Sequence, residues 1–169
     1  NQDAVRWFLE SIFPLVKRRC PRATLFIMGK KLPEDIQSLR SDSVVITGYV
    51  PDLKREVQRC QVAIAPYRIG GGLRFKILES FAMRVPVVST TVGCEGIEAE
   101  HQKHLLIGDS PERFAQAIVR LFEDHVLRES LVTQAYALAA EKYQWGSVAE
   151  KFELVYHRVV DKKKREMIQ

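Results

Sequence analysis

QVAIAPYRIGGGLRFKILESFAMRVPVVST, residues 61–90, is the stretch that decides the fold. It opens with a short apolar run at 62–65 and closes with another at 86–89. Such short continuous runs are typical of strands that are covered on both faces, as in a parallel sheet. Between them, three glycines precede a segment from Leu73 to about Met83 that we expect to be helical. The stretch therefore predicts a strand, a loop, a helix and a second strand, the repeating unit of α/β folds.

The same alternation continues on both sides of this stretch. Further apolar runs predict strands at 23–28, 44–47 and 105–107. Helices are expected at 3–13, 34–39 and 52–60. Asp3 is expected to cap the first of these helices, and Pro14 to kink or break it. Because strands that alternate with helices form a parallel sheet covered on both faces, the sequence predicts a doubly wound α/β fold.

The last third of the chain is expected to be helical. Ser110 is a favourable N-cap, and Pro111 follows it at the first helical position. A second helix is predicted from about Val126 to Glu141, and a last one begins near Ser147. Because the sequence has no internal repeat and no flexible linker, we interpret residues 1–169 as one α/β domain with C-terminal helices.

Length, charge and cysteine content limit the functional classes. The chain has 169 residues and a formal net charge of +5, and no apolar run approaches the roughly 20 residues of a membrane-spanning helix. Positive charge alone leaves a nucleotide, an acidic lipid surface and a nucleic acid open as partners. Much of the excess lies at 162–165, which we interpret as a solvated end rather than a membrane or nucleic-acid contact. Cys20, Cys60 and Cys94 match no zinc or disulfide spacing, which favours a reducing cytosol.

The loop that contains the three glycines at 70–72 has the properties of a phosphate site. Glycines let the backbone approach an anion closely, and the helix expected from Leu73 directs free N–H groups at it. Arg74 and Lys76 place two cations in the first turn, where the helix dipole disfavours each by about 0.3–1 kcal/mol. Since a bound anion would turn this cost into attraction, the sequence predicts an anionic ligand here. The alternative is an ordinary flexible turn.

Two further groups of polar residues are expected near this loop. Glu79 lies on the same helix, where its carboxylate can accept hydrogen bonds from the two vicinal hydroxyls of a ribose; the alternative is an ion pair with Lys76 on a solvated face. The loop after the next strand carries Thr90, Thr91 and Glu95, which can line the same crevice or form a plain turn. No group of residues has metal-ligand spacing, so no metal is expected.

The central run also resembles a known family. Residues 71–90 closely resemble the donor-site segment of family 4 glycosyltransferases, and more narrowly that of bacterial sugar transferases of polysaccharide and exopolysaccharide biosynthesis. Shorter segments are similar to the family in the same order, at 1–14, 21–29, 45–51, 63–67, 95–97, 114–118 and 143–145. The resemblance implies the donor-binding, C-terminal half of a GT-B fold, which is a Rossmann-like domain.

The resemblance also implies roles for single residues. Glu79 matches the second glutamate of the family's E-x7-E motif, which holds the donor ribose. The loop amides approach the donor phosphates and sugar, and the two cations would stabilise the leaving diphosphate. The expected catalytic residues are therefore Arg74 and Lys76. The expected substrate-binding residues are Gly70, Gly71, Gly72, Leu73, Glu79, Thr90, Thr91 and Glu95.

Two departures from the family pattern bear on function. Gly71 stands where the first glutamate of the motif would fall, so the loop amides would act without that carboxylate. By the resemblance, we also expect the chain to begin after the first strand of the half-domain, whose following loop often supplies a donor-phosphate Arg or Lys in the family. The resemblance likewise implies that the N-terminal acceptor domain lies outside this sequence. We therefore expect a fragment that is inactive alone.

The expected function is the donor-binding part of a retaining, metal-independent glycosyltransferase of the hexosyltransferase type. It would move a sugar from a UDP- or GDP-sugar to a glycan or lipid-linked acceptor, which the missing N-terminal domain would hold, with no cofactor and no nucleic-acid partner. A cytoplasmic location is expected, and peripheral contact with the inner face of the cell membrane stays open. One alternative, which Gly71 supports, is a non-catalytic doubly wound module that binds a phosphorylated ligand or a protein. A weaker alternative is a GT-B-fold sugar-nucleotide epimerase.

Overall fold

The computed structural model describes residues 1–29, 32–147, 149, 152–153 and 155–157. The basic run at 162–165 lies outside them. The strands are β1 (Leu25–Met28), β2 (Val44–Gly48), β3 (Ala63–Ala65), β4 (Val87–Ser89) and β5 (Leu106–Ile107). The helices are α1 (Gln2–Trp7), the π-helical η1 (Phe8–Ile12), α2 (Phe13–Arg19), α3 (Glu34–Gln37), α4 (Leu53–Gln58), α5 (Phe75–Ala82), α6 (Pro111–Glu123) and α7 (His125–Lys142).

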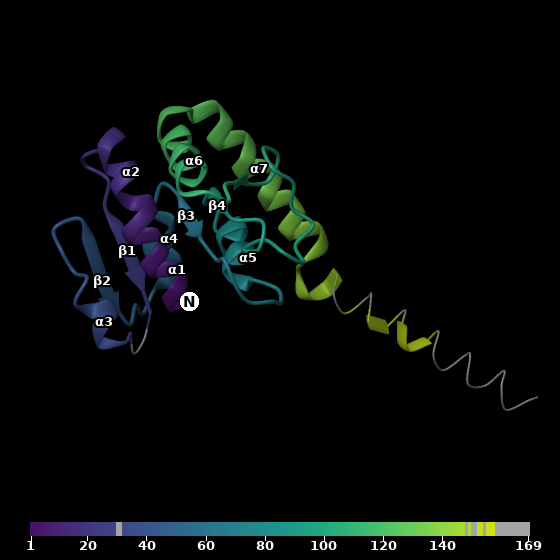
Figure 1. The fold of residues 1–169 in the computed structure, drawn as a ribbon. Coiled ribbons are helices and arrows are strands. Elements are labelled where there is room, and N and C mark those ends of the chain that lie inside the picture. The colour runs from purple at the N-terminus through teal and green to yellow at the C-terminus, as the bar shows by residue number, and fades with distance from the viewer. Residues whose placement is uncertain (30–31, 148, 150–151, 154, 158–169) are drawn as a thin grey trace, which may run out of the picture.

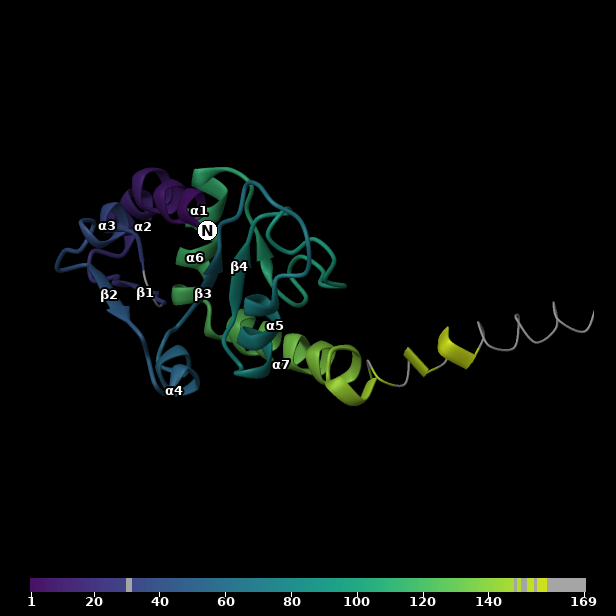
Figure 2. The same cartoon turned by 90° about the horizontal axis from the view of Figure 1, so that it is seen from below.

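The strands pair in parallel, as predicted, but they form two sheets rather than one. β1 pairs with β2, and β3, β4 and β5 lie side by side in that order. Figures 1 and 2 show the β1–β2 sheet standing apart from the other sheet, with helices packed around both. The α/β class with parallel strands is therefore confirmed. A single sheet is not formed: β1 and β3 do not pair with each other, and both line a groove of about 860 Å³.

The first hydrophobic core joins the two sheets. It contains side chains from β1, β2, β4 and β5, packed against α1, η1, α2 and α6. Phe114 of α6 is fully buried in it and meets the rings of Trp7 and Phe8 edge-on, with ring centroids 6.1 Å apart in each pair. The two sheets are thus held in place by helices that pack on one shared face.

The second core lies on the opposite face of the β3–β4–β5 sheet. Val88 belongs to the first core and Val87 to the second, as expected for successive residues of a strand. Ile77 and Phe81 of α5 are buried in the second core together with Leu138 of α7. This packing fixes the helix that follows the glycine loop.

The first helix differs from its prediction in two ways. Asp3 does not cap α1, because the helix begins at Gln2 and Asp3 lies in its first turn. The N-cap is Asn1, which makes no side-chain hydrogen bond, and the Asp3 carboxylate pairs with Arg68. Pro14 does not break the helix. It lies in the first turn of α2, and the widened turns of η1 precede it. Because a proline lacks the N–H that a regular turn requires, a local change to π-helical bonding lets the helix continue.

Side-chain caps begin three of the other helices. Ser110 caps α6 as predicted, accepting a hydrogen bond from the N–H of Arg113 at 3.3 Å. Asp52 and Asp124 do the same for α4 and α7. Such caps satisfy backbone donors that the first helical turn leaves unpaired. None of the described helices combines the length and the apolar character needed to cross a membrane.

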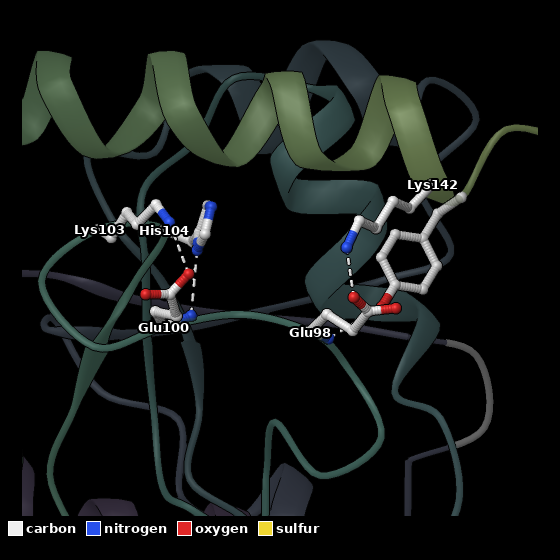
Figure 3. A network of polar contacts seen from close by, with 6 residues as sticks. Glu98, Glu100, Lys103, His104 and Lys142 are labelled. Carbon is white, nitrogen blue, oxygen red and sulfur yellow. Dashed lines mark hydrogen bonds and ion pairs between the residues drawn. The ribbon is translucent and has the colours of Figure 1, made fainter.

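A network of polar contacts ties the long loop after β4 to the end of α7, as Figure 3 shows. Lys142 pairs with the carboxylate of Glu98, and the Glu98 N–H donates to the Tyr143 hydroxyl at 2.8 Å. Closer to β5, the N–H of Glu100 donates to Nδ1 of His104 at 3.0 Å, while its carboxylate pairs with Lys103. The loop is therefore attached to the end of α7 at Glu98, and its last turn before β5 is held by contacts within the loop.

Candidate functional site

Three loops meet at the carboxyl ends of the β3–β4–β5 sheet, where open parallel sheets bind ligands. They follow β3, β4 and β5 and cover residues 66–74, 90–105 and 108–110. The Thr90 hydroxyl donates a hydrogen bond to the carbonyl of Tyr67, which joins the first loop to the second. The N–H and hydroxyl of Thr91 contact the Asp109 carboxylate at 2.7 and 2.8 Å, which joins the second loop to the third.

The glycine loop is exposed and has two positions that require glycine. Gly70 and Gly72 have φ of 101° and 88°, in a region that is unfavourable for residues with a Cβ. Gly71 lies outside that region, and a Cβ built on it would meet no atom within 4 Å. The turn therefore depends on the first and third glycines, whereas the middle position is open to larger residues.

Arg74 folds back over this loop. The helix α5 begins at Phe75, two residues later than predicted, so Arg74 occupies the N-cap position. Its guanidinium carbon lies 4.6 Å from the centre of the Tyr67 ring, and Nη2 donates to the carbonyl of Ile69 at 3.4 Å. The same nitrogen would lie 2.7 Å from a Cβ at Gly70. Contact with the aromatic face and with the loop backbone thus holds a positive charge directly against the glycines.

One donor of Arg74 has no partner. Its Nε is buried and makes no hydrogen bond, and no other buried side-chain nitrogen or oxygen in the described part of the chain is left so. Burying a hydrogen-bond donor of a charged group without an acceptor lowers the stability of the fold. Because most buried polar groups have a partner, an unpaired one requires an explanation. An acceptor supplied by a ligand at the loop would satisfy it.

Lys76 and Glu79 extend from the exposed side of α5. Both line the groove between β1 and β3. The ion pair between them that we considered as the alternative is not formed, although both residues lie in the described part of the chain. The Glu79 carboxylate is therefore available to a ligand, but it faces the groove rather than lying under the glycine loop.

The second loop contains one structural tether and two exposed side chains. Thr90 is 3% exposed, and its hydroxyl also accepts a hydrogen bond from the Gly93 N–H at 2.9 Å. Both hydroxyl functions are thus used within the protein. Thr91 and Glu95 are exposed. A Cβ at Gly96 would lie 3.8 Å from the Leu73 side chain, which places the two loops next to each other.

The structure adds residues that we did not assign to the site from the sequence. Tyr67 supplies the ring beneath Arg74, and Asp109 holds Thr91. Each follows a strand within two residues, and that position is a signal that sequence reasoning could have used. Arg68, on the same loop, pairs with Asp3 and stacks over Trp7 at 5.2 Å. Its hydrogen bond and charge lower the pKa of the Asp3 carboxyl.

Cys94 is buried beside the second loop, and burial raises the pKa of its thiol. A raised pKa keeps the sulfur protonated at neutral pH, where it is a poor nucleophile. The arrangement of the glycine loop and the Arg74 guanidinium is suited to binding an anion.

The sequence matches a family model described as "Glycosyl transferases group 1" over residues 1–124. The chain belongs to this family. A protein described as an uncharacterised 44.6 kDa protein in the cps region of Klebsiella pneumoniae is 24% identical over 152 residues, which are 85% of this chain and 39% of that protein. The chain thus spans well under half the length of that relative.

Solved structures of other glycosyltransferases share the GT-B fold of this group 1 domain. Anabaena HepE in complex with UDP superposes with a TM-score of 0.75 at 15% identity, covering 86% of this chain and 44% of HepE. The C-terminal domain of a group 1 family protein, LpcC of Francisella tularensis, gives a TM-score of 0.63 at 19% identity, covering 78% of this chain and 75% of that one. At these identities the likeness establishes the fold and nothing finer.

Proposed function

We propose that this chain is the donor-binding domain of a glycosyltransferase that moves a sugar from a nucleotide-sugar to a glycan or lipid-linked acceptor. The observation that carries the proposal is the Arg74 guanidinium, held against the glycine loop with one buried donor unpaired. A diphosphate bound at the exposed loop would accept from that donor and from the backbone amides at 70–72. Membership of the group 1 family supports the same assignment.

The donor would extend from the loop towards α5. In this proposal Glu79 holds the ribose through its free carboxylate, and Lys76, one turn earlier on the same exposed side, faces the phosphates. Leu73, Thr91 and Glu95 border the crevice. Thr90 contributes by fixing the two loops to each other, since its hydroxyl is already engaged by Tyr67 and Gly93. HepE has been solved with UDP and with UDP-glucose, which supports a uridine nucleotide as the first ligand to test.

The chemical contribution of the domain would be electrostatic. When the bond between the sugar and the diphosphate breaks, negative charge grows on the departing phosphate oxygens. Arg74, Lys76 and the helix N-terminus would stabilise that charge without a bridging metal. We further propose that the transfer retains the configuration of the sugar. The location of the Klebsiella relative in a cps region supports polysaccharide biosynthesis as the setting. We further propose that the protein acts at the cytoplasmic side of the cell membrane.

Titration calorimetry with UDP and GDP tests the proposal, on the 169-residue chain and on the intact protein. We expect one nucleotide to bind, and Arg74→Ala to weaken binding by about 10–100-fold because it removes charge-assisted hydrogen bonds. Glu79→Ala should weaken UDP more than inorganic diphosphate, since Glu79 would contact the ribose. Matched controls are Arg120→Ala and Glu141→Ala, which remove exposed charges from α6 and α7.

A non-catalytic module remains the second candidate, because Gly71 replaces the acidic residue that the family motif would place near the donor sugar. Turnover distinguishes the two functions. If the intact protein binds a nucleotide-sugar but transfers no sugar to any glycan or lipid-linked acceptor in membrane extracts, the chain is a binding module. If no nucleoside diphosphate binds and the two variants behave like wild type, both forms of the proposal are wrong.

A further inference from the structure

A second pocket lies between α7 and the part of the loop that leads into β5. Its volume is about 630 Å³, and small-molecule sites commonly measure about 300–1,000 Å³. Because β5 runs parallel to β4, the residues just before β5 lie at the amino end of the sheet. The glycine loop lies at the opposite, carboxyl end, and none of its residues lines the pocket. The pocket is therefore separate from the candidate donor-binding site.

His104 presents a fixed hydrogen-bond donor to this pocket. Its side chain is 6% exposed, and Nδ1 accepts the N–H of Glu100 at 3.0 Å. A ring nitrogen that accepts carries no proton, so the neutral imidazole has its proton on Nε2. Burial lowers the pKa of the imidazole, which keeps the ring neutral near neutral pH. Nε2 is therefore a donor whose position is set by the bond at Nδ1.

That donor has no acceptor among the residues that the structure describes. Figure 3 shows Nε2 directed towards α7, away from Glu100. Unlike Nε of Arg74, it is not enclosed by protein, because His104 lines the pocket and Nε2 opens into it. Since the polar groups of buried side chains are nearly always hydrogen-bonded, the acceptor for Nε2 is expected to come from whatever occupies the pocket.

The charges of the lining limit the class of occupant. Three carboxylates and two ammonium groups border the pocket, from Glu98, Glu100, Glu141, Lys103 and Lys142. Lys142 pairs with Glu98, and Lys103 pairs with Glu100 at 2.6 Å. A ligand of either sign would therefore meet a like charge at the rim, which disfavours its binding. The lining is suited to a neutral ligand that carries many polar groups.

The remaining side chains of the lining combine an amide with an apolar strip. Gln134 of α7 is half-buried, and its amide nitrogen contacts the Ser130 hydroxyl at 3.4 Å, which leaves its carbonyl oxygen for a ligand. Ala137 and Leu138 lie beside it on the same helix. A sugar matches this combination, because each hydroxyl can both donate and accept. The carbon-bound hydrogens on the face of its ring fit the apolar strip.

We propose that this pocket binds a neutral saccharide. One sugar hydroxyl accepts the hydrogen bond of His104 Nε2, a second hydroxyl donates to the carbonyl oxygen of Gln134, and the ring packs on Ala137 and Leu138. A bound sugar would thus connect the loop before β5 to the middle of α7. A free sugar and one unit of a glycan chain share this chemistry, and the test below distinguishes them.

Nitrogen NMR of the full chain, isotope-labelled at histidine and glutamine, tests the proposal. No nucleotide is added, so the outcome is independent of the proposed function. The probes are the methyl glycosides of glucose, galactose, mannose and N-acetylglucosamine, and a linear trisaccharide of each sugar. We expect at least one probe to shift the signals of His104 Nε2 and the Gln134 amide saturably. A trisaccharide that binds about 10-fold more tightly than its methyl glycoside identifies a glycan chain as the source, and equal affinity identifies a free sugar.

Two variants remove the proposed contacts. Gln134→Ala should weaken the best saccharide by about 10-fold or more without lowering the melting temperature, because alanine is favourable in a helix. His104→Phe, which keeps a ring but lacks the donor, should weaken it similarly. Gln116→Ala removes an exposed amide from α6 and is the matched control.

Three results would overturn the proposal. The first is that no saccharide moves both signals, and the second is that Gln134→Ala binds the saccharide as wild type does. The third uses spermidine as a cation and citrate as an anion. If either of them shifts the Nε2 signal of His104 more than any saccharide does, the pocket is a site for a charged ligand.

Discussion

Gly71 and Gly72 are neighbours in the loop, but a side chain would have opposite effects at the two positions. At Gly71 a Cβ meets open space, so Gly71→Glu should leave the free energy of unfolding within about 0.5 kcal/mol of wild type. At Gly72, with φ of 88°, Gly72→Ala should lower it by about 1–2 kcal/mol. Urea unfolding followed by circular dichroism measures both. Equal losses in the two variants would show that the loop conformation differs from the one described.

Thr90 differs from the other predicted site residues because it is buried and fully hydrogen-bonded. Thr90→Val keeps the volume but leaves the Gly93 N–H without its acceptor, so the free energy of unfolding should fall by about 1–3 kcal/mol. Thr90→Ser keeps the hydroxyl, so its free energy of unfolding should fall by less than that of Thr90→Val. Thr133→Val, at an exposed position of α7, is the control. If Thr90→Val melts like wild type while nucleotide binding is lost, Thr90 contacts ligand and does not act as a tether.

For single residues, the sequence indicates which side chains belong to the candidate site better than it indicates their burial and contacts. The cations and glycines stand out because they are unusual at a helix start, and the structure brings Arg74 onto the loop. The burial of Thr90 could not be predicted, because it depends on the Tyr67 carbonyl, 23 positions away. The site residues themselves stay predictions until a ligand is bound.

Among the elements, the loop after β4 contains a buried histidine, and we expect its titration to make the stability of the domain depend on pH. His104 is 6% exposed, and burial, together with the nearby Lys103, lowers the pKa of its imidazole. The unfolded chain therefore takes up the proton first as the pH falls. The free energy of unfolding should decrease as the pH is lowered from 7.5 through about 6.5, the ordinary pKa of histidine.

Unfolding in urea at pH 7.5 and 5.5 measures this effect. The window lies above the range in which carboxylates titrate, so the lowered pKa values of Asp3 and Glu100 do not contribute to the difference. At pH 7.5, His104→Gln should have a lower free energy of unfolding than wild type. Between pH 7.5 and pH 5.5, its free energy of unfolding should decrease less than that of wild type. His125→Gln is the control, since that side chain is exposed on α7. If the free energy of unfolding of His104→Gln changes with pH as much as that of wild type, His104 is not the source of the pH dependence.

The elements themselves were largely predictable, because each depends on local signals. All five strands lie within the predicted apolar runs or within one residue of them, and the Ser110 and Asp52 starts follow from capping chemistry. Two features were not predictable. Pro14 is accommodated by η1, and the sheet is divided between β1 and β3, because both depend on the packing of distant segments rather than on local sequence.

For the whole molecule, the two sheets make no backbone hydrogen bonds with each other, so the first hydrophobic core is what joins them. Phe114 lies in that core, so Phe114→Ala should lower the free energy of unfolding by about 3–5 kcal/mol. Because a domain of this size is stable by only about 5–15 kcal/mol, the midpoint in urea should shift strongly. Phe152→Ala, which removes a 74% exposed ring, is the control. A loss below 1 kcal/mol would show that the sheets are joined by other means.

The two walls of the groove are also completed at different times during synthesis. β1 ends at residue 28 and β3 at residue 65, so at about 5–20 residues per second roughly 2–7 s pass between them on the ribosome. β3 does not pair with β1, so the β1 edge has no partner strand before or after this interval. Until β3 is made, however, the groove has no second wall, and the β1 edge is more open to other nascent chains. Synonymous codons that slow translation between these residues should therefore reduce the soluble yield without changing a single amino acid.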